Sequence, residues 1–333
     1  MSTPALPDPS GPARPRALDR ARGLLACLAA YLAAGAAALI AGRLSGGLHP
    51  LLAAGLADLA ATVVVFAFSL AYNNSSFYDP YWSLAPPVLA LYWLLAAGSR
   101  GLPARQALAG ALLAIWAARL TFNWLRRWRG LSHEDWRYAD YQRAGAAYGP
   151  AATAAPRHGY LPYSPAATAA PQHGYLPYWL ISFAGFHLMP TLLVFLGCLS
   201  LWPALSFGRP LGLLDLAAAL LTAGAVLLEA AADRQLARFL ASAGPEEVLD
   251  TGLWSLSRHP NYFGEVAFWW GLWLFGLAAA PSWWWTVAGP LSITALFLGV
   301  SVPMMDRHLA AGRPRYAAEL KKRSAFLPWF PRK

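Results

Sequence analysis

The sequence is poor in charged residues. Only 13% of its 333 residues are Asp, Glu, Lys or Arg, while 57% are hydrophobic. Soluble domains carry about 25% charged residues, so the composition argues against a water-soluble domain and indicates a lipid-embedded chain. Cysteine is scarce as well. Cys27 and Cys198 both lie in apolar runs, which excludes a disulfide framework and a zinc-type ligand spacing.

Familiar nucleotide and nucleophile motifs are also missing. The chain has no G-x-G-x-x-G and no G-x-x-x-x-G-K-[ST], so neither a Rossmann site nor a P-loop is predicted. It has no G-x-S-x-G, which excludes the nucleophile elbow of the α/β hydrolases. Any nucleotide that the protein binds must therefore be held by a binding site of another kind.

Long apolar runs dominate what is present. A membrane-spanning helix needs about 20 apolar residues. The runs at 84–98 and 265–280 are short and are expected to be tilted, re-entrant or interfacial. The candidate spans are 23–42, 51–72, 84–98, 106–125, 179–201, 212–232, 265–280 and 282–303. We therefore predict an all-α, polytopic transmembrane helix bundle with about seven or eight membrane helices.

The net charge of +10 follows from topology. If the amino terminus is cytoplasmic, 21 of the 26 Lys and Arg fall on the cytoplasmic side, and Arg119 lies within a span. This asymmetry is what the positive-inside rule predicts, so both termini are expected in the cytoplasm and no nucleic-acid partner is implied. The residues expected on the other side are Arg43, Arg100, Arg105 and Arg209.

Two segments outside the spans are low in complexity. Residues 1–22 are rich in Pro and Arg and are predicted to form a disordered tail before a single membrane domain over 23–333. GPAATAAPRHGYLPY (149–163) is followed by the near-copy SPAATAAPQHGYLPY. Two units are too few for a solenoid, so 149–178 is expected to be an extended loop insert without a metal site.

Polar residues stand at the threshold of the 265–280 run, in the stretch RHPNYFGE. Pro260 suits the first position of a helix, which would place Asn261 and Glu265 one turn apart on one face. The positive end of that helix would favour a phosphate. An interfacial belt explains Arg and Trp but not an acid inside an apolar run, so a binding site is predicted. Its candidates are Arg258, His259, Asn261, Tyr262 and Glu265.

Charged residues also interrupt two other spans. Glu229 and Asp233 lie one turn apart with Arg238 beyond them, which suits either an internal salt-bridge network or a ligand site. Arg119 is either a snorkelling cation or a buried partner for a pyrophosphate.

Three further stretches are polar. NNSSFYDPYWSLAPP (73–87) places irregular backbone at membrane depth, which requires burial in protein or a cavity wall. LSHEDWRYADYQR (131–143) is expected to be a solvated helix face. The carboxyl-terminal stretch after the last span suits either adhesion to the membrane surface or a grip on a cofactor.

Four separated stretches together resemble the DUF1295 family of polytopic membrane proteins. They are NNSSFYDPYWSLAPP, LTFNWLRRWRGLSHEDWRY, GLWSLSRHPNYFGE and RPRYAAELKKRSAFLPW. That family is related to the steroid 5-alpha-reductase C-terminal domain and, more distantly, to sterol reductases and isoprenylcysteine carboxyl methyltransferases. The resemblance implies a helix bundle that holds NADPH in a cavity open to the cytoplasm and takes a lipid-like substrate from the bilayer.

The resemblance also implies site residues. Asp79 with Tyr78 or Tyr81 stands in for the Glu and Tyr that polarise the ketone in steroid reductases, a departure that leaves the steroid substrate open. Asp79 can donate a hydrogen bond only when protonated, and an apolar cavity favours the neutral acid. Glu229 stands where steroid reductases have Asn. The implied cofactor residues are Arg119, Glu229, Asp233, Arg238, Arg258, His259, Asn261, Tyr262, Glu265, Asp306, Arg307, His308 and Tyr316.

Three functions fit these expectations. The first is an NADPH-dependent oxidoreductase that reduces an activated C=C bond, an enone, in a steroid-like or other lipid substrate. The second is an S-adenosylmethionine-dependent methyltransferase acting on a lipid or prenyl group. The third is a non-enzymatic membrane protein that binds lipid. In each case the protein is expected among membrane lipids, in a bacterial plasma membrane or an endoplasmic reticulum.

Overall fold

The computed structural model of the chain describes residues 14–148, 178–244, 247–320 and 322–330. Seven helical segments in these ranges are long and apolar enough to cross a membrane. They are Leu18–Leu44, Pro50–Ala71, Ser75–Arg100, Pro103–Arg127, Tyr178–Ser206, Leu213–Ser242 and Pro281–Gly312. The described residues form helices and no strand, so the predicted all-α transmembrane bundle is confirmed and the protein is a multi-pass integral membrane protein.

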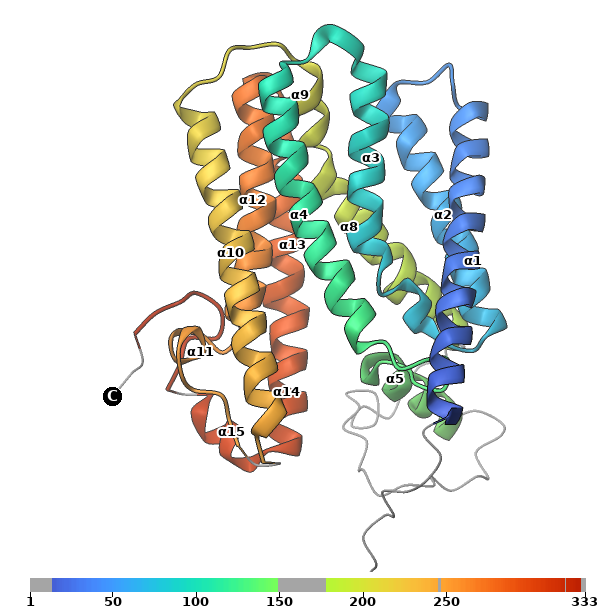
Figure 1. Cartoon of the computed structure of the whole chain (residues 1–333), viewed down its shortest axis with the longest axis vertical. Coiled ribbons are helices and arrows are strands. Elements are labelled where there is room, and N and C mark those ends of the chain that lie inside the picture. The colour runs from blue at the N-terminus through green and yellow to red at the C-terminus, as the bar shows by residue number, and fades with distance from the viewer. Residues whose placement is uncertain (1–13, 149–177, 245–246, 321, 331–333) are drawn as a thin grey trace, which may run out of the picture.

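The helices run alternately up and down through the bundle (Figure 1). In chain order they are α1 (Arg14–Leu44), α2 (Pro50–Ala71), η1 (Ser75–Tyr78), α3 (Tyr81–Ala97), η2 (Gly98–Arg100), α4 (Pro103–Arg127), α5 (Trp136–Tyr148), α7 (Tyr178–Ile181), η3 (Ser182–Leu188), α8 (Met189–Cys198), α9 (Leu201–Ser206), α10 (Leu213–Ser242), α11 (Leu253–Leu256), α12 (Pro260–Ala279), η4 (Pro281–Val287), α13 (Ala288–Leu296), η5 (Phe297–Ser301), α14 (Val302–Gly312) and α15 (Pro314–Glu319).

The two ends of the bundle differ in charge. We call the end with α5, α11 and α15 the basic end; it also holds the start of α1 and the carboxyl-terminal stretch (Figure 1). The opposite end carries the turns at 45–49, 98–102 and 207–212. The four arginines expected outside the cytoplasm lie in these turns or in the helix ends next to them. The charge split predicted from sequence therefore coincides with the two ends, and the cytoplasmic assignment of the basic end stays a prediction.

Helix α12 is an eighth long helix, packed against α4, α9, α10 and α13. Its 20 residues span about 30 Å and cross from the basic end to the opposite end (Figure 1). The runs 265–280 and 84–98 belong to longer helices, because α12 begins at Pro260, as its sequence predicts, and the third span covers Ser75–Arg100; of the three expectations for these runs, a re-entrant or interfacial segment is wrong and tilt stays a prediction. Each helix continues beyond its apolar run into a stretch that contains Tyr and polar residues, and much of that stretch is buried in the protein.

The outer surface of the bundle is apolar. On α1, Leu25, Leu32 and Leu39 recur every seven residues and are each about two-thirds exposed. A polar solvent would disfavour such a face, whereas lipid acyl chains match it. Cys27 and Cys198 are both buried and free, in agreement with the absence of a disulfide framework.

The amino-terminal boundary differs from the predicted one. Helix α1 begins at Arg14, so the end of the predicted disordered tail (1–22) is helical. Residues 1–13 and the duplicated insert up to residue 177 lie outside the described residues.

Glycines allow α10 and α12 to approach closely. A Cβ on Gly271 would lie 2.1 Å from Thr222 Oγ1, and one on Gly264 would lie 2.4 Å from Glu229 Cγ. The two glycines are seven residues apart and therefore share one face of α12. Small residues at such positions let helix backbones pack in lipid, where no hydrophobic force drives helices together.

We predict that Gly271→Ala lowers the melting temperature of the detergent-purified protein, because the added methyl forces α10 and α12 apart, at about 1–3 kcal/mol. Gly224→Ala on α10 is the matched control, since nothing lies within 4 Å of its added Cβ. That control should be neutral or stabilising by up to about 1 kcal/mol. Equal melting temperatures for the two variants would contradict the packing argument.

Candidate functional site

One arginine and three carboxylates meet between α4, α10 and α12. Arg119 on α4 binds both Glu229 and Asp233 on α10, and its Nη2 lies 3.9 Å from Glu265 Oε2 on α12. Glu229 and Glu265 are only 2% and 4% exposed. We call these four residues the Arg119 cluster. Three carboxylates for one guanidinium leave a formal excess of two negative charges.

Neighbouring donors orient the acids of the Arg119 cluster. The indole N–H groups of Trp116 and Trp269 donate to the two oxygens of Glu265, at 3.0 and 2.9 Å. Asn123 Nδ2 donates to Asp233 Oδ2 at 2.8 Å. Glu265 is thus fully engaged by the protein, and its position is held from two helices.

Three buried polar atoms in or next to the Arg119 cluster have no hydrogen-bond partner within the described part of the chain. They are Arg119 Nε, Glu229 Oε1 and Asn261 Oδ1. Buried unpaired polar atoms are rare in native proteins and call for an explanation, such as a ligand or a bound water. The Arg119 cluster therefore has unused hydrogen-bonding capacity that points to a binding site.

The structure bears on one of the two alternatives left open for Arg119, while binding of a pyrophosphate stays a prediction. Its guanidinium is buried by the protein's own acids, so it does not snorkel to the membrane surface. Glu229 and Asp233 form the internal salt-bridge network that their spacing allowed. They neutralise the positive charge of Arg119 to which a pyrophosphate would bind.

A second polar cluster surrounds Asp306 at the basic end. Asp306 pairs with Arg258 Nη2 and His259 Nε2, both at 2.8 Å, and accepts from the Tyr316 hydroxyl at 2.7 Å. Burial, together with the Asp306 carboxylate, raises the pKa of Tyr316, which keeps its phenol a neutral donor. We call these four residues the Asp306 cluster.

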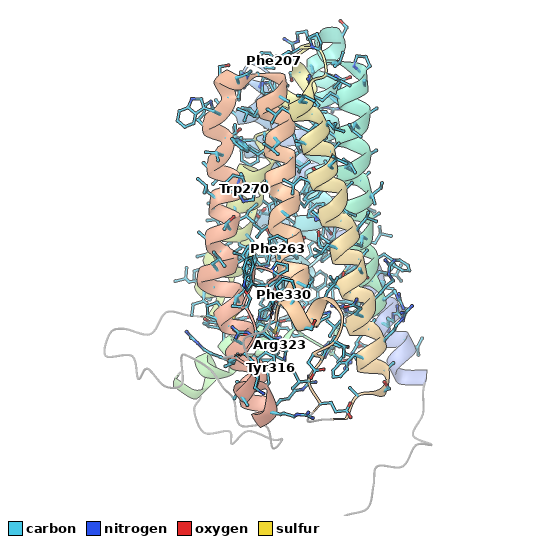
Figure 2. All side chains as sticks on the ribbon, turned by 90° about the vertical axis from the view of Figure 1, so that its left-hand side faces the viewer. Phe207, Phe263, Trp270, Tyr316, Arg323 and Phe330 are labelled. Atoms are coloured by element: carbon cyan, nitrogen blue, oxygen red, sulfur yellow. The ribbon has the colours of Figure 1, made fainter. Side chains whose placement is uncertain are left out.

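The carboxyl-terminal residues 322–330 form a strap over the segment that precedes α12. The Arg258 backbone N–H donates to Ser324 O at 2.9 Å, and its guanidinium donates to the carbonyls of Leu320 and Arg323. Figure 2 shows Tyr316 and Arg323 at the basic end and Phe207 at the opposite one. Arg258 is thus largely occupied in holding this strap, which differs from the free phosphate partner that the sequence suggested.

The remaining predicted cofactor residues are less closely grouped. Tyr262 stacks on His259, with ring centroids 5.1 Å apart, while His308 stacks on Trp136 of α5 at 3.7 Å. Arg238 and Arg307 are exposed and make no hydrogen bond or ion pair within the described residues. The structure therefore gathers ten of the candidates around the first two turns of α12 and leaves these two cations on the surface of the same end.

The tyrosines of the predicted catalytic group lie together in the other half of the bundle. The Tyr78 and Tyr81 rings stack with centroids 5.0 Å apart. The Tyr78 hydroxyl bonds Thr191 Oγ1 at 2.7 Å, and the Tyr81 hydroxyl donates to Asp58 Oδ1 at 2.6 Å. As predicted, the irregular backbone is buried in protein over residues 75–78, which are all at most 3% exposed, although Asn73 before them is exposed.

Asp79 faces another way. Its Oδ1 accepts from the Tyr138 hydroxyl of α5 at 2.7 Å, so its carboxylate and the two tyrosine hydroxyls have different partners. The structure thus holds the three predicted catalytic residues adjacent in the chain without a hydrogen bond between them.

Two buried ionisable residues were missed by the sequence analysis. Asp58 is 6% exposed within α2, and His187 is fully buried in the π-helical turn η3. His187 Nε2 bonds Ser69 Oγ at 2.9 Å and its Nδ1 bonds the Ser182 carbonyl at 2.8 Å. Each is a single ionisable residue inside an apolar run, which is itself the signal of a functional candidate, and π-helical turns often occur at functional sites.

The expectation that 131–143 is a solvated helix face is wrong. Glu134 Oε1 accepts from the Ser75 backbone N–H at 2.6 Å, and the Asp135 N–H donates to Ser76 Oγ at 3.0 Å. Burial raises the pKa of Glu134. Burial also acts to raise the pKa of Asp135, but the Arg137 guanidinium, 2.7 Å from its Oδ1, outweighs that effect and lowers it. The local sequence did not predict this contact, because Ser75, the partner of Glu134, lies 59 residues earlier in the chain.

We predict that Arg119→Gln lowers the melting temperature strongly, since it leaves buried carboxylates without their cation, at about 3–5 kcal/mol. Adding Glu229→Gln should restore part of that loss, because one buried charge disappears. Arg126→Gln on the same helix is the control, as Arg126 is exposed and forms no ion pair among the described residues. If Arg119→Gln melts like Arg126→Gln, the cluster does not stabilise the bundle.

Glu134 supplies a pH-dependent prediction. Because its pKa is raised on folding, ionised Glu134 disfavours the folded state, and this disadvantage is present above the folded pKa and absent below the unfolded one. Glu134→Gln should therefore gain melting temperature relative to the unaltered protein as pH rises from about 4 to about 7.5. Glu134→Ala loses the acceptor for Ser75 and should melt lower throughout, by about 1–3 kcal/mol. A Gln effect independent of pH would contradict this assignment.

Comparison with known proteins supplies a family. The DUF1295 profile, described as a protein of unknown function, matches residues 65–153 and 169–323. No curated protein and no solved structure matches the chain. The two matched stretches cover most of the sequence and include every element of the Arg119 and Asp306 clusters. The chain therefore belongs to the DUF1295 family.

Proposed function

We propose that the protein is a membrane enzyme that binds NADPH at the basic end and reduces an activated C=C bond of a lipid-like substrate. One observation carries the proposal. Predicted cofactor residues from separate stretches meet around the first turns of α12 and leave Glu229 Oε1 and Asn261 Oδ1 buried without partners. Such atoms suit the N–H and O–H donors of a nucleotide's ribose and carboxamide groups.

The same end offers cations for the phosphates. Arg238 and Arg307 are exposed there and unengaged within the described residues, whereas Arg119 and Arg258 are neutralised by Asp and Glu. In the proposed complex Arg238 and Arg307 hold phosphate oxygens. When bound, NADPH would supply a hydride to the carbon β to the substrate carbonyl and become NADP⁺, and a proton from water would reach the α carbon to give the saturated product.

The substrate side is assigned to the polar group in the amino-terminal half. Reduction of an enone builds negative charge on the carbonyl oxygen, which a placed hydrogen-bond donor stabilises. Tyr78, Tyr81 and a protonated Asp79 are the proposed donors. Asp58 and Thr191 hold the two phenols in place, and each phenol exchanges that partner for the carbonyl oxygen when it donates to the substrate, since a phenol has one O–H.

One feature favours a second candidate. The formal excess of two negative charges in the Arg119 cluster would attract a cation, and the sulfonium of S-adenosylmethionine is one. The second candidate is therefore methyl transfer from S-adenosylmethionine to a lipid or prenyl group.

Thermal stabilisation separates the candidates. We expect NADPH at 100 times its Kd to stabilise the purified protein by about 2.7 kcal/mol and S-adenosylmethionine to have no effect. Asn261→Ala and Arg238→Gln should weaken the NADPH shift, and Arg129→Gln, at an exposed control position, should not. Stabilisation by S-adenosylmethionine alone would select the methyltransferase. Stabilisation by neither would favour the non-enzymatic alternative.

Turnover tests the chemistry. With a panel of enone lipids, we expect oxidation of NADPH that depends on the enone. Tyr78→Phe or Tyr81→Phe should lower kcat by about 10²–10³-fold, as removal of one oxyanion donor does, while NADPH affinity is unchanged. Full activity in both Phe variants and in Asp79→Asn would contradict the assignment of the donors.

A further inference from the structure

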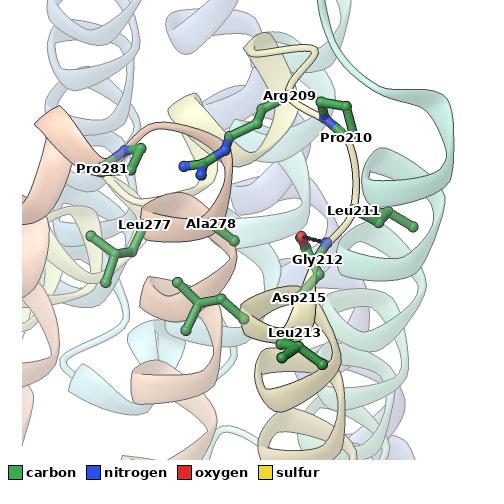
Figure 3. A pocket seen from close by; sticks show the side chains of 10 residues that line it. Arg209, Pro210, Leu211, Gly212, Leu213, Asp215, Leu277, Ala278 and Pro281 are labelled. Atoms are coloured by element: carbon green, nitrogen blue, oxygen red, sulfur yellow. Dashed lines mark hydrogen bonds between the residues drawn. The ribbon is translucent and has the colours of Figure 1, made fainter.

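A hollow of 710 Å³ opens at the opposite end of the bundle, far from both polar clusters (Figure 3). It lies between the 207–212 loop, the first turn of α10 and the end of α12. Its volume is within the range of about 300–1,000 Å³ that small-molecule sites occupy.

The hollow contains an uncompensated cation. The Arg209 side chain extends from the loop across the space toward Pro281 (Figure 3), and it makes no hydrogen bond or ion pair within the described residues. The acid among the lining residues, Asp215, is already bound by Arg105 at 2.7 and 3.1 Å and by the Gly212 N–H at 2.9 Å. Because Asp215 is paired with Arg105, the hollow carries the positive charge of Arg209.

The walls beside that cation are apolar. Leu211 and Leu213 are 48% and 87% exposed, and Leu277 of α12 lines the hollow on the side nearer Pro281 (Figure 3). Trp284 and Trp285 follow in η4 and are also exposed. Exposed tryptophans at the ends of membrane helices mark the depth of lipid headgroups.

We propose that this hollow binds an anionic phospholipid of the leaflet at the opposite end. The Arg209 fork holds the phosphate, and an acyl chain lies along Leu211, Leu213 and Leu277. A guanidinium with free donors matches phosphate oxygens in two-point geometry, and an apolar wall continuous with the lipid-facing surface receives the chain. This site is independent of the proposed reductase activity.

Native mass spectrometry of the full-length protein tests the site, with phosphatidylglycerol and phosphatidylcholine as competing probes. We expect preferential retention of phosphatidylglycerol and a loss of about tenfold in its affinity in Arg209→Gln, the value of one charged hydrogen bond. Arg209→Lys should fall between, because it keeps the charge and loses the fork. Arg43→Gln is the matched control, an exposed cation of the same end outside the hollow, and should bind like the unaltered protein.

Two results would overturn the proposal. One is equal retention of phosphatidylglycerol by Arg209→Gln and Arg43→Gln. The other concerns the source of the phosphate: inorganic phosphate that binds as tightly as phosphatidylglycerol would show a free-anion site without a lipid. A further variant, Leu213→Asn, should weaken the binding of phosphatidylglycerol and leave any binding of inorganic phosphate unchanged.

Discussion

The pairing of Arg119 with the acids of α10 and α12 is the interaction on which the carboxyl-terminal half depends. Buried charges in a lipid-embedded protein persist only when they are paired and hydrogen-bonded. Arg119 achieves this from α4, and it thereby links α4 to the α10–α12 pair. The arrangement needs Gly264, because a Cβ there would collide with the Glu229 side chain. Helix packing and site geometry are thus one constraint in this region.

The structure also ties the chain's last residues to the start of α12. Arg258 and His259 bind Asp306, and the strap at 322–330 covers them through main-chain hydrogen bonds. The entrance to the proposed cofactor site is therefore built from three stretches that are distant in sequence, and any displacement of the strap changes the surroundings of Arg258. The residues of the proposed substrate side are organised separately, by contacts of 75–79 with 134–138, η3 and α8.

The two ends of the bundle use charge in different ways. At the basic end Arg119 and Arg258 are compensated by carboxylates, whereas Arg238 and Arg307 are exposed and make no hydrogen bond or ion pair within the described residues. At the opposite end Arg105 is compensated by Asp215, which leaves Arg209 over an apolar hollow. One nucleotide-like ligand and one lipid-like ligand are the partners that these two arrangements suit.

Local composition was enough to predict the bundle, because spans and the positions of Arg and Lys depend on composition and on the cost of placing polar groups in lipid. The start of α12 at Pro260 and the shared face of Asn261 and Glu265 also follow from the sequence, through the preference of Pro for a helix start and through helix periodicity. The fold was needed to show that Arg119 is neutralised by Glu229 and Asp233, that 131–143 docks on 73–79, and that Arg258 holds the strap. These contacts join residues 59 to 114 positions apart, and nothing in local composition says which buried cation meets which acid.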